Sequence, residues 1–221
     1  MRTAAVLPVK SFGRAKQRLD EAVGQPDRAE LAAGMVGDVL SALAAVAALH
    51  EVIVVTAEPQ AAAAARTAGA HVVDDPVESG QSDAAARGVA AAVARGAERV
   101  LLVPGDCPTL DAGEVGAVLD GFAGAGVVIV PDRHGSGTNA LRLTPPEVIA
   151  PAFGPGSFAR HAALGAAAGA VVRVAQAPSL ELDVDTPGDL AALRAALQRL
   201  PSAAPRTRAL LERLAPRSAV A

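Results

Sequence analysis

Short apolar runs alternate with alanine-rich helical patterns along the chain as far as residue 131. The apolar runs predict strands, over residues 3–9, 51–56, 70–74, 99–104 and 126–131. The intervening patterns predict helices, over residues 27–49, 59–68, 82–95 and 111–122. Continuous Val, Ile and Leu runs are typical of strands buried on both faces, as in a parallel sheet covered by helices. The alternation therefore favours a doubly wound α/β domain.

The pattern becomes less regular after residue 131. It predicts, in order, a polar glycine-rich loop at 132–138, a strand that need not be parallel at 139–143, a loop at 151–156, a helix at 157–169, a strand at 171–175, an extended segment at 179–184 and a helix at 187–200. We therefore expect a single domain over residues 1–200, with a mixed, mainly parallel sheet. Residues 201–221 are expected to form a Pro- and Arg-rich tail, with a short helix near 206–214 and a frayed end.

Composition narrows the class of protein and of partner. The 221 residues fit one domain, and 51% hydrophobic residues suffice for a sizeable core. A net charge of −3 provides no basic field for a nucleic acid, so none is expected as a partner. The single cysteine, Cys107, fits a reducing compartment, and neither a signal peptide nor a membrane span is evident. We expect a cytoplasmic protein that has no membrane partner.

The loop after the first strand is strongly basic. It carries Lys10, Arg14, Lys16 and Arg18 within nine residues. Ligands bind at the carboxyl ends of strands in open α/β sheets, and cationic side chains stabilise the charge on a transferred phosphoryl group. The loop therefore either holds a triphosphate or is simply a solvated basic segment.

Two acidic motifs suit a divalent cation. Asp106 lies just past the predicted strand 99–104, where it is either a magnesium ligand or an ordinary turn residue. Asp183 and Asp185 are two residues apart in an extended segment, so they project to one side and can share a cation. Asp189 instead fits a capping box that begins at Thr186, and we assign it a structural role. We interpret Cys107 as a packed residue rather than a nucleophile.

Two further loops contain glycines and small hydroxyl side chains. They cover residues 132–138 and 153–158, and the second precedes a predicted helix. Backbone N–H groups at a helix N-terminus bind anions, although either segment can be a simple loop. His134 is either catalytic or solvated. The other histidines, at positions 50, 71 and 161, show no metal-ligand spacing.

Five short motifs occur in a characteristic order. They are Pro-Val-Lys with Ala-Lys-x-Arg-Leu, Pro-Gly-Asp-Cys-Pro, Asp-Arg-x-Gly-x-Gly-Thr-Asn-Ala-Leu, Phe-Gly-x-x-Ser-Phe and Leu-Asp-Val-Asp-Thr-Pro. Together, over about residues 3–197, they resemble the guanylyltransferases that act on 2-phospho-L-lactate or phosphoenolpyruvate in coenzyme F-420 biosynthesis. The resemblance implies a GT-A-like (Rossmann-like) nucleotidyltransferase fold, GTP as donor, pyrophosphate as by-product and Mg²⁺, with two ions expected.

The resemblance also implies roles for individual residues. The metal ligands would be Asp106, Asp183 and Asp185, and the contacts to the acceptor would be Thr138, Gly154 and Ser157. The triphosphate would be held by the basic loop, above all by Lys10 and Lys16, with Arg14 and Arg18 beside them. Members of the family carry Gly-Leu-Asn in the loop that meets the base, where this chain has Gly80-Gln81-Ser82-Asp83. Gly80 and Ser82 are therefore the candidates for base contacts.

Three functions remain open at this point. The first is in-line attack by the acceptor's phosphate oxygen on the α-phosphorus of GTP, with handover of the labile product to a downstream transferase. The second is nucleotidyl transfer on the same fold to another acceptor, as in molybdenum-cofactor enzymes. The third is a non-catalytic nucleotide-binding domain. Phosphoenolpyruvate, 2-phospho-L-lactate and 3-phosphoglycerate all stay open as acceptors.

Overall fold

The computed structural model of the chain describes residues 1–14, 16–19, 23–120 and 124–214. Its strands are β1 (Thr3–Val9), β2 (Glu51–Thr56), β3 (His71–Asp74), β4 (Arg99–Leu102), β5 (Gly126–Pro131), β6 (Thr138–Thr144) and β7 (Val171–Val174). Its α-helices are α1 (Gln25–Ala44), α2 (Pro59–Thr67), α3 (Gln81–Ala94), α4 (Ala112–Leu119), α5 (Ser157–Ala167), α6 (Pro178–Glu181), α7 (Pro187–Arg199) and α8 (Pro205–Arg213). Two short 3-10 turns, η1 (Phe12–Arg14) and η2 (Gln17–Leu19), follow β1.

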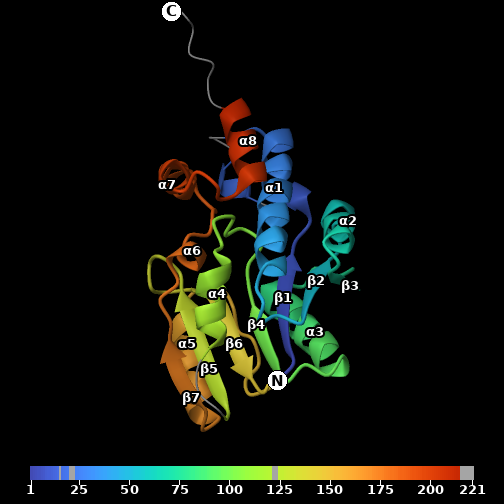
Figure 1. Cartoon of the computed structure of the whole chain (residues 1–221), viewed down its shortest axis with the longest axis vertical. Coiled ribbons are helices and arrows are strands. Elements are labelled where there is room, and N and C mark those ends of the chain that lie inside the picture. Colours follow the sequence, from blue (N-terminus) through green and yellow to red (C-terminus); the bar gives the residue numbers. More distant parts are fainter. Residues whose placement is uncertain (15, 20–22, 121–123, 215–221) are drawn as a thin grey trace, which may run out of the picture.

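The strands form one mixed sheet in the order β3-β2-β1-β4-β6-β5-β7 (Figure 1). β1 pairs in parallel with both β2 and β4, and β5 pairs in parallel with β7. Among the described strands, β6 alone runs in the opposite direction, antiparallel to β4 and to β5. The prediction of a mixed, mainly parallel sheet flanked by helices is confirmed.

Helices cover both faces of the sheet, as the buried strands require. Alternate β1 residues, Ala5 and Leu7, pack in the cluster formed with α1, α2, α4 and α6, whereas Val6 packs against α3 in the opposite layer. The approach of α3 to the sheet depends on Gly88, because a Cβ atom there would lie 2.3 Å from Cγ1 of Val6 and 2.9 Å from Cγ2 of Val55. Glycine at this position therefore sets how closely α3 packs.

The last two helices extend this core along α1. Leu31 and Met35 of α1 form a third buried cluster with side chains of α7 and α8, and Figure 1 shows α8 lying beside α1. The Asp38 side chain accepts hydrogen bonds from the backbone N–H groups of Arg206 and Thr207, at 3.1 and 2.9 Å, in the first turn of α8. The short helix predicted near 206–214 is confirmed as α8. The predicted frayed end, from residue 215, lies outside the described residues.

The extended segment predicted for 179–184 is wrong in its first half. Residues Pro178–Glu181 form the single helical turn α6. Its geometry is fixed by contacts to α4: the Ser179 N–H donates to Glu114 Oε2 at 2.9 Å, and the Ser179 hydroxyl accepts from the Asp111 N–H at 3.0 Å. Leu180 is fully buried beneath this turn. Polar and apolar residues alternate over positions 179–185, which favours an extended segment, so the local pattern gives no sign of the turn.

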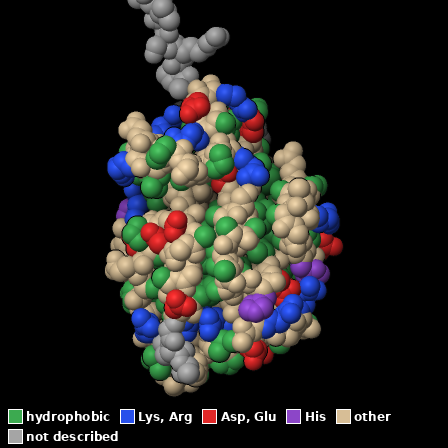
Figure 2. Space-filling model, in the orientation of Figure 1, with side chains coloured by type: hydrophobic (Ala, Val, Ile, Leu, Met, Phe, Trp, Pro, Cys, Tyr) green, Lys and Arg blue, Asp and Glu red, His purple; other side chains and the backbone are tan. Residues whose placement is uncertain are grey.

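The surface over α1, α2 and α4 differs between the middle of the molecule and its ends. Small and apolar side chains dominate the middle, whereas Lys and Arg side chains gather towards the end formed by α7 and α8 and towards the opposite end of the sheet (Figure 2).

None of the helices in the described part of the chain combines the length and apolar character needed to span a bilayer.

Candidate active site

A cleft of about 570 Å³ lies at the carboxyl ends of the parallel strands. The loops after β1, β3 and β4 open onto it. Because β6 runs antiparallel, its first residues, Thr138 and Asn139, reach the same edge of the sheet. The predicted site residues that line the cleft are Lys10, Lys16, Arg18, Gly80, Asp106, Thr138, Gly154, Ser157, Asp183 and Asp185. The fold thus brings together residues from six separate parts of the sequence.

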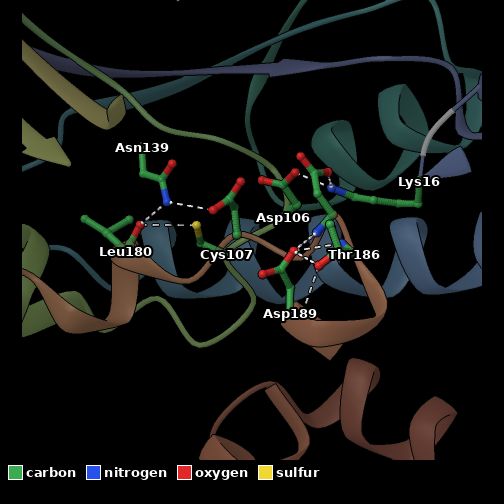
Figure 3. A network of polar contacts seen from close by, with 9 residues as sticks. Lys16, Asp106, Cys107, Asn139, Leu180, Thr186 and Asp189 are labelled. Atoms are coloured by element: carbon green, nitrogen blue, oxygen red, sulfur yellow. Dashed lines mark hydrogen bonds and ion pairs between the residues drawn. The ribbon is translucent and has the colours of Figure 1, made fainter. Parts of the chain in front are cut away.

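Lys16 lies between two of the predicted metal ligands. Its ammonium group hydrogen-bonds to Asp106 Oδ2 and, at 2.8 Å, to Asp185 Oδ1, and Figure 3 shows its side chain pointing at this acidic group. Burial by itself lowers the pKa of Lys16, but the two carboxylates outweigh burial and raise the pKa well above its usual range. Lys16 is therefore a fixed positive charge at the position where a cation is expected.

Asp183 is held by β6 and α6. Asn139 Nδ2 donates to Asp183 Oδ1 at 3.2 Å and to the Leu180 carbonyl at 2.9 Å. Burial, followed by repulsion from Asp106, raises the pKa of Asp183. Val184, the residue after it, is fully buried and donates its N–H to the Asp106 carbonyl at 3.2 Å. Asp183 and Asp185 therefore face the cleft on the same side, as their spacing predicts.

The three carboxylates suit a hard divalent cation in chemistry, although they do not form a finished cage. In the described part of the chain no three His, Cys, Asp or Glu side chains are arranged to hold a metal as they stand. Asp106 Oδ1 is nevertheless buried without a hydrogen-bond partner, and its two acidic neighbours line the same cleft. Magnesium commonly takes one or two carboxylates and completes its shell with phosphate oxygens and water. The donor set therefore fits Mg²⁺ arriving with a nucleotide.

Asp189 stabilises the backbone of the segment that carries Asp183 and Asp185. Thr186 and Asp189 form the predicted capping box at the start of α7, and Asp189 Oδ2 also accepts from the N–H of Asp185 at 3.1 Å. An ion pair with Arg133 ties the same carboxylate to the loop after β5. The structural role predicted for Asp189 is confirmed, and through it the acidic segment is fixed to two neighbouring elements.

The other side of the cleft is built on β6 and α5 and carries Thr138, Gly154 and Ser157; we call it the anion cradle, after the ligand that these residues are predicted to hold. The Thr138 N–H donates to Ser157 Oγ at 2.9 Å, and Ser157 is the first residue of α5. His161, which is fully buried, lies 2.9 Å from the Thr138 hydroxyl through Nδ1 and accepts the Ala152 N–H through Nε2 at 2.9 Å. Because Nε2 is an acceptor, the neutral ring carries its proton on Nδ1 and donates to Thr138.

Gly154 completes the cradle. It adopts φ 104°, in the region that favours glycine, and lines the cleft next to the start of α5. The loop after β5 is held by Asp132, whose carboxylate accepts the N–H groups of His134, Ser136 and Gly137 at 3.1, 3.0 and 2.9 Å. Helix N-termini and glycine-rich loops of this kind bind anions.

Three further residues that the sequence singles out are Ser82, Arg14 and Cys107. Ser82 is not among the residues that line the cleft; its hydroxyl accepts the Phe153 N–H at 2.9 Å and so fixes the loop that carries Gly154. Its role as a base contact stays a prediction. The side chain of Arg14 lies outside the described residues. Cys107 is fully buried, and burial, followed by the charge of Asp106, raises the pKa of its thiol well above the usual value, as expected for a packed cysteine.

Sequence reasoning missed two residues of the site. Asn139 stands within one of the five motifs, which gives it no separate role, and in the structure it holds Asp183. His161 shows no ligand spacing in the sequence. Its two hydrogen bonds reach residues 23 and 9 positions away, so no local pattern reveals them.

Comparison with known proteins places the chain among nucleotidyltransferases. The sequence profile of the family described as "Guanylyl transferase CofC like" matches residues 3–195. A phosphoenolpyruvate guanylyltransferase from Conexibacter woesei is 46% identical over 216 residues, 97% of this chain and 97% of that protein. Its namesake from Thermomonospora curvata is 44% identical over 210 residues, 95% of this chain and 88% of the relative.

A solved structure supports the fold independently. A Desulfovibrio desulfuricans protein classed as a nucleotide-diphospho-sugar transferase aligns with a TM-score of 0.75 at 20% identity, covering 96% of this chain and 95% of that one. The predicted GT-A-like nucleotidyltransferase fold is confirmed.

Proposed function

The chain belongs to the CofC-like guanylyl transferase family, and we propose that it transfers GMP from GTP to phosphoenolpyruvate, or to 2-phospho-L-lactate, in coenzyme F-420 biosynthesis. The product would be enolpyruvyl-diphospho-guanosine, or its lactyl counterpart, together with pyrophosphate. The relatives' names support guanylyl transfer, and the buried cysteine that stays a free thiol supports a cytoplasmic setting. The observation that carries the proposal is one cleft with a lysine–carboxylate group on one side and an anion cradle on the other.

The donor triphosphate would lie along the basic loop. Lys10 and Arg18 line the cleft and are exposed to it, whereas Lys16 is already fixed next to Asp106. Cationic groups preorganised around a transferred phosphoryl group make the greatest contribution to catalysis of this kind. We propose that Lys10 and Lys16 contact the triphosphate, with Arg14 and Arg18 assisting.

Asp106, Asp183 and Asp185 would hold the divalent cation, which we propose to be Mg²⁺ in two copies. Bound there, magnesium would neutralise the crowded anions and the charge on leaving pyrophosphate. The carboxylates themselves would hold the cation in the cleft. Asn139 keeps Asp183 aimed into the cleft.

The acceptor would be held by Thr138, Gly154 and Ser157. Since His161 donates to the Thr138 oxygen, the hydrogen of the Thr138 hydroxyl is free to point at an anion in the cleft. An acceptor phosphate oxygen then attacks the α-phosphorus of GTP. A new P–O bond forms, the bond from that phosphorus to the bridging oxygen breaks, and its electron pair leaves with pyrophosphate. The acceptor phosphate is ionised near neutral pH, so the step needs neither a protein nucleophile nor a general base, and catalysis rests on positioning together with electrostatic stabilisation.

Pyrophosphate release with GTP and Mg²⁺ tests the proposal. Phosphoenolpyruvate, 2-phospho-L-lactate and 3-phosphoglycerate are supplied singly, with the downstream transferase present to consume the labile product. Release with GTP and one of the first two acceptors is the expected result. Release only with another nucleotide or another acceptor would favour a different nucleotidyltransferase, such as one of the molybdenum-cofactor type. Nucleotide binding without release from any pair would mean a non-catalytic domain.

A further inference from the structure

The side of the cleft that is formed after β3 contains an acidic side chain to which the proposed mechanism gives no role. Asp75 follows β3, lines the cleft together with Gly80 and Ala84, and is 5% exposed. Its Oδ1 atom is buried and has no hydrogen-bond partner. An ion pair to Arg87 of α3 brings Nη2 to 3.4 Å, which supplies charge but no hydrogen bond.

A buried carboxylate oxygen without a hydrogen bond is costly, and native structures satisfy most such atoms. The neighbouring acid shows the contrast. Glu78 Oε1 accepts both the N–H and the hydroxyl of Ser11, at 2.7 and 2.8 Å. Glu78 is thus used to fix the loop after β1, whereas the Asp75 carboxylate lines the cleft and has the Arg87 ion pair as its only polar side-chain contact within the described part of the chain. Its surroundings suit a ligand that brings N–H donors.

The sheet order sets how far Asp75 lies from the reacting centre. β3 is separated from β4, which Asp106 follows, by β2 and β1. Three intervals between neighbouring strands amount to about 14 Å, comparable to the length of an extended nucleoside monophosphate. If the α-phosphate lies beside Asp106, as the proposed function requires, the base of the same nucleotide reaches Asp75.

We propose that Asp75 reads the Watson–Crick edge of guanine. The carboxylate would accept the N1–H and the 2-amino group, which are adjacent donors in guanine, through charge-assisted hydrogen bonds. Adenine presents a lone pair at N1 in the same place, so its approach leaves Asp75 facing another acceptor. This inference rests on the proposed function, and it assigns base specificity to Asp75 rather than to the Gly80-Gln81-Ser82 segment that departs from the family pattern.

Nucleotide analogues test this inference on the unaltered protein. Inosine triphosphate lacks the 2-amino group, and xanthosine triphosphate replaces it with an oxygen that faces the carboxylate. Binding with Mg²⁺, measured by calorimetry, should be weaker than for GTP by about 10-fold or more for each analogue. Equal affinity for GTP and inosine triphosphate would overturn the assignment. Because binding alone is measured, the result does not depend on which acceptor the protein uses or on turnover.

Asp75→Asn gives the sharper test. An amide accepts N1–H through its oxygen and donates to a 2-oxo group through its nitrogen, so the variant matches xanthine. We expect affinity for GTP to fall about 100-fold and affinity for xanthosine triphosphate to rise until the preference inverts. Asp74→Asn, an exposed neighbour outside the cleft, is the matched control and should keep the wild-type preference.

A purely structural role would have a different signature. Arg87→Gln removes the ion-pair partner but leaves the acceptor atoms, so it should preserve the preference for GTP. If Asp75→Asn weakens all three nucleotides alike, or if Arg87→Gln inverts the preference in the same way, Asp75 only anchors α3 and the proposal is wrong. If Asp75→Asn inverts the preference and yet no nucleotide gives pyrophosphate release in any protein, base reading stands and the proposed transfer fails.

Discussion

Replacing His161 by glutamine should reveal how the anion cradle depends on a neutral imidazole. In the native protein the ring bridges the Thr138 hydroxyl and the Ala152 N–H from a fully buried position. Burial, assisted by the nearby Arg160, lowers the pKa of His161 from 6.5 to about 4. Protonation would convert Nε2 from an acceptor into a donor facing another donor. The native fold therefore favours the neutral ring.

The sign and size of the effect follow from linkage. Because the folded-state pKa lies below the unfolded value, the unfolded chain binds more protons between pH 6.5 and 4. The stabilising contribution is therefore complete above pH 6.5 and is lost as pH falls towards 4. A pKa lowered to about 4 corresponds to about 3 kcal/mol over that range. His161→Gln cannot titrate, so its free energy of unfolding should lack this component.

Urea unfolding followed by far-UV circular dichroism measures the difference, since the chain has no Trp or Tyr for fluorescence. At pH 7.5 the variant should be less stable by about 1–3 kcal/mol, because it loses buried hydrogen bonds. Towards pH 4 the two free energies should converge. His134→Gln, at an exposed position, should follow the wild type throughout. A constant gap between wild type and His161→Gln at all pH values would refute the reasoning, as would an unchanged KM for the acceptor at pH 7.5.

Three further changes test the site and the core. Asp183→Asn should abolish turnover without lowering Tm, and near-normal activity would rule out its role as a metal ligand. Lys16→Met leaves partly exposed carboxylates without their positive partner. In EDTA it should therefore lower the free energy of unfolding by about 1–3 kcal/mol. Millimolar Mg²⁺ should recover more stability in Lys16→Met than in wild type; equal recovery contradicts competition between lysine and metal. Gly88→Ala should destabilise by about 1–3 kcal/mol by denaturant unfolding. Gly116→Ala, whose added Cβ meets nothing within 4 Å, should raise the free energy of unfolding by up to about 1 kcal/mol. A similar loss of stability in both variants would contradict the packing argument.

Features coded within a few residues could be predicted from the sequence. Asp183 and Asp185 face the same cleft because of their spacing, and the capping box at Thr186 uses a side chain only three residues away. The strand–helix alternation likewise depends on local apolar patterns, which is why most elements are found where they are expected. The strong motifs also marked the cleft, because the carboxyl ends of neighbouring parallel strands meet at one edge.

Features that depend on distant partners could not be predicted in this way. Lys16 lies 90 residues from Asp106 and 169 from Asp185, and nothing in its own loop shows that it will be buried between them. The turn α6 is fixed by a hydrogen bond spanning 65 residues. Asp75 stands in an ordinary Asp-Asp-Pro sequence, and only the strand order places it in line with the reacting centre. Such residues become visible once the topology is known.

The reversed direction of β6 explains how the two proposed subsites can share one edge of the sheet. Had β6 run parallel to β4, its last residue, Thr144, would lie at the cleft. Because it runs antiparallel, Thr138 and Asn139 lie there instead, directly beside the loop that carries Asp106. In the proposed reaction the strands from β3 to β1 would support the donor side, and β6 with α5 would support the acceptor side. These halves meet at β4, where Lys16 and the three carboxylates gather, so the proposed reaction would have the α-phosphorus at that point.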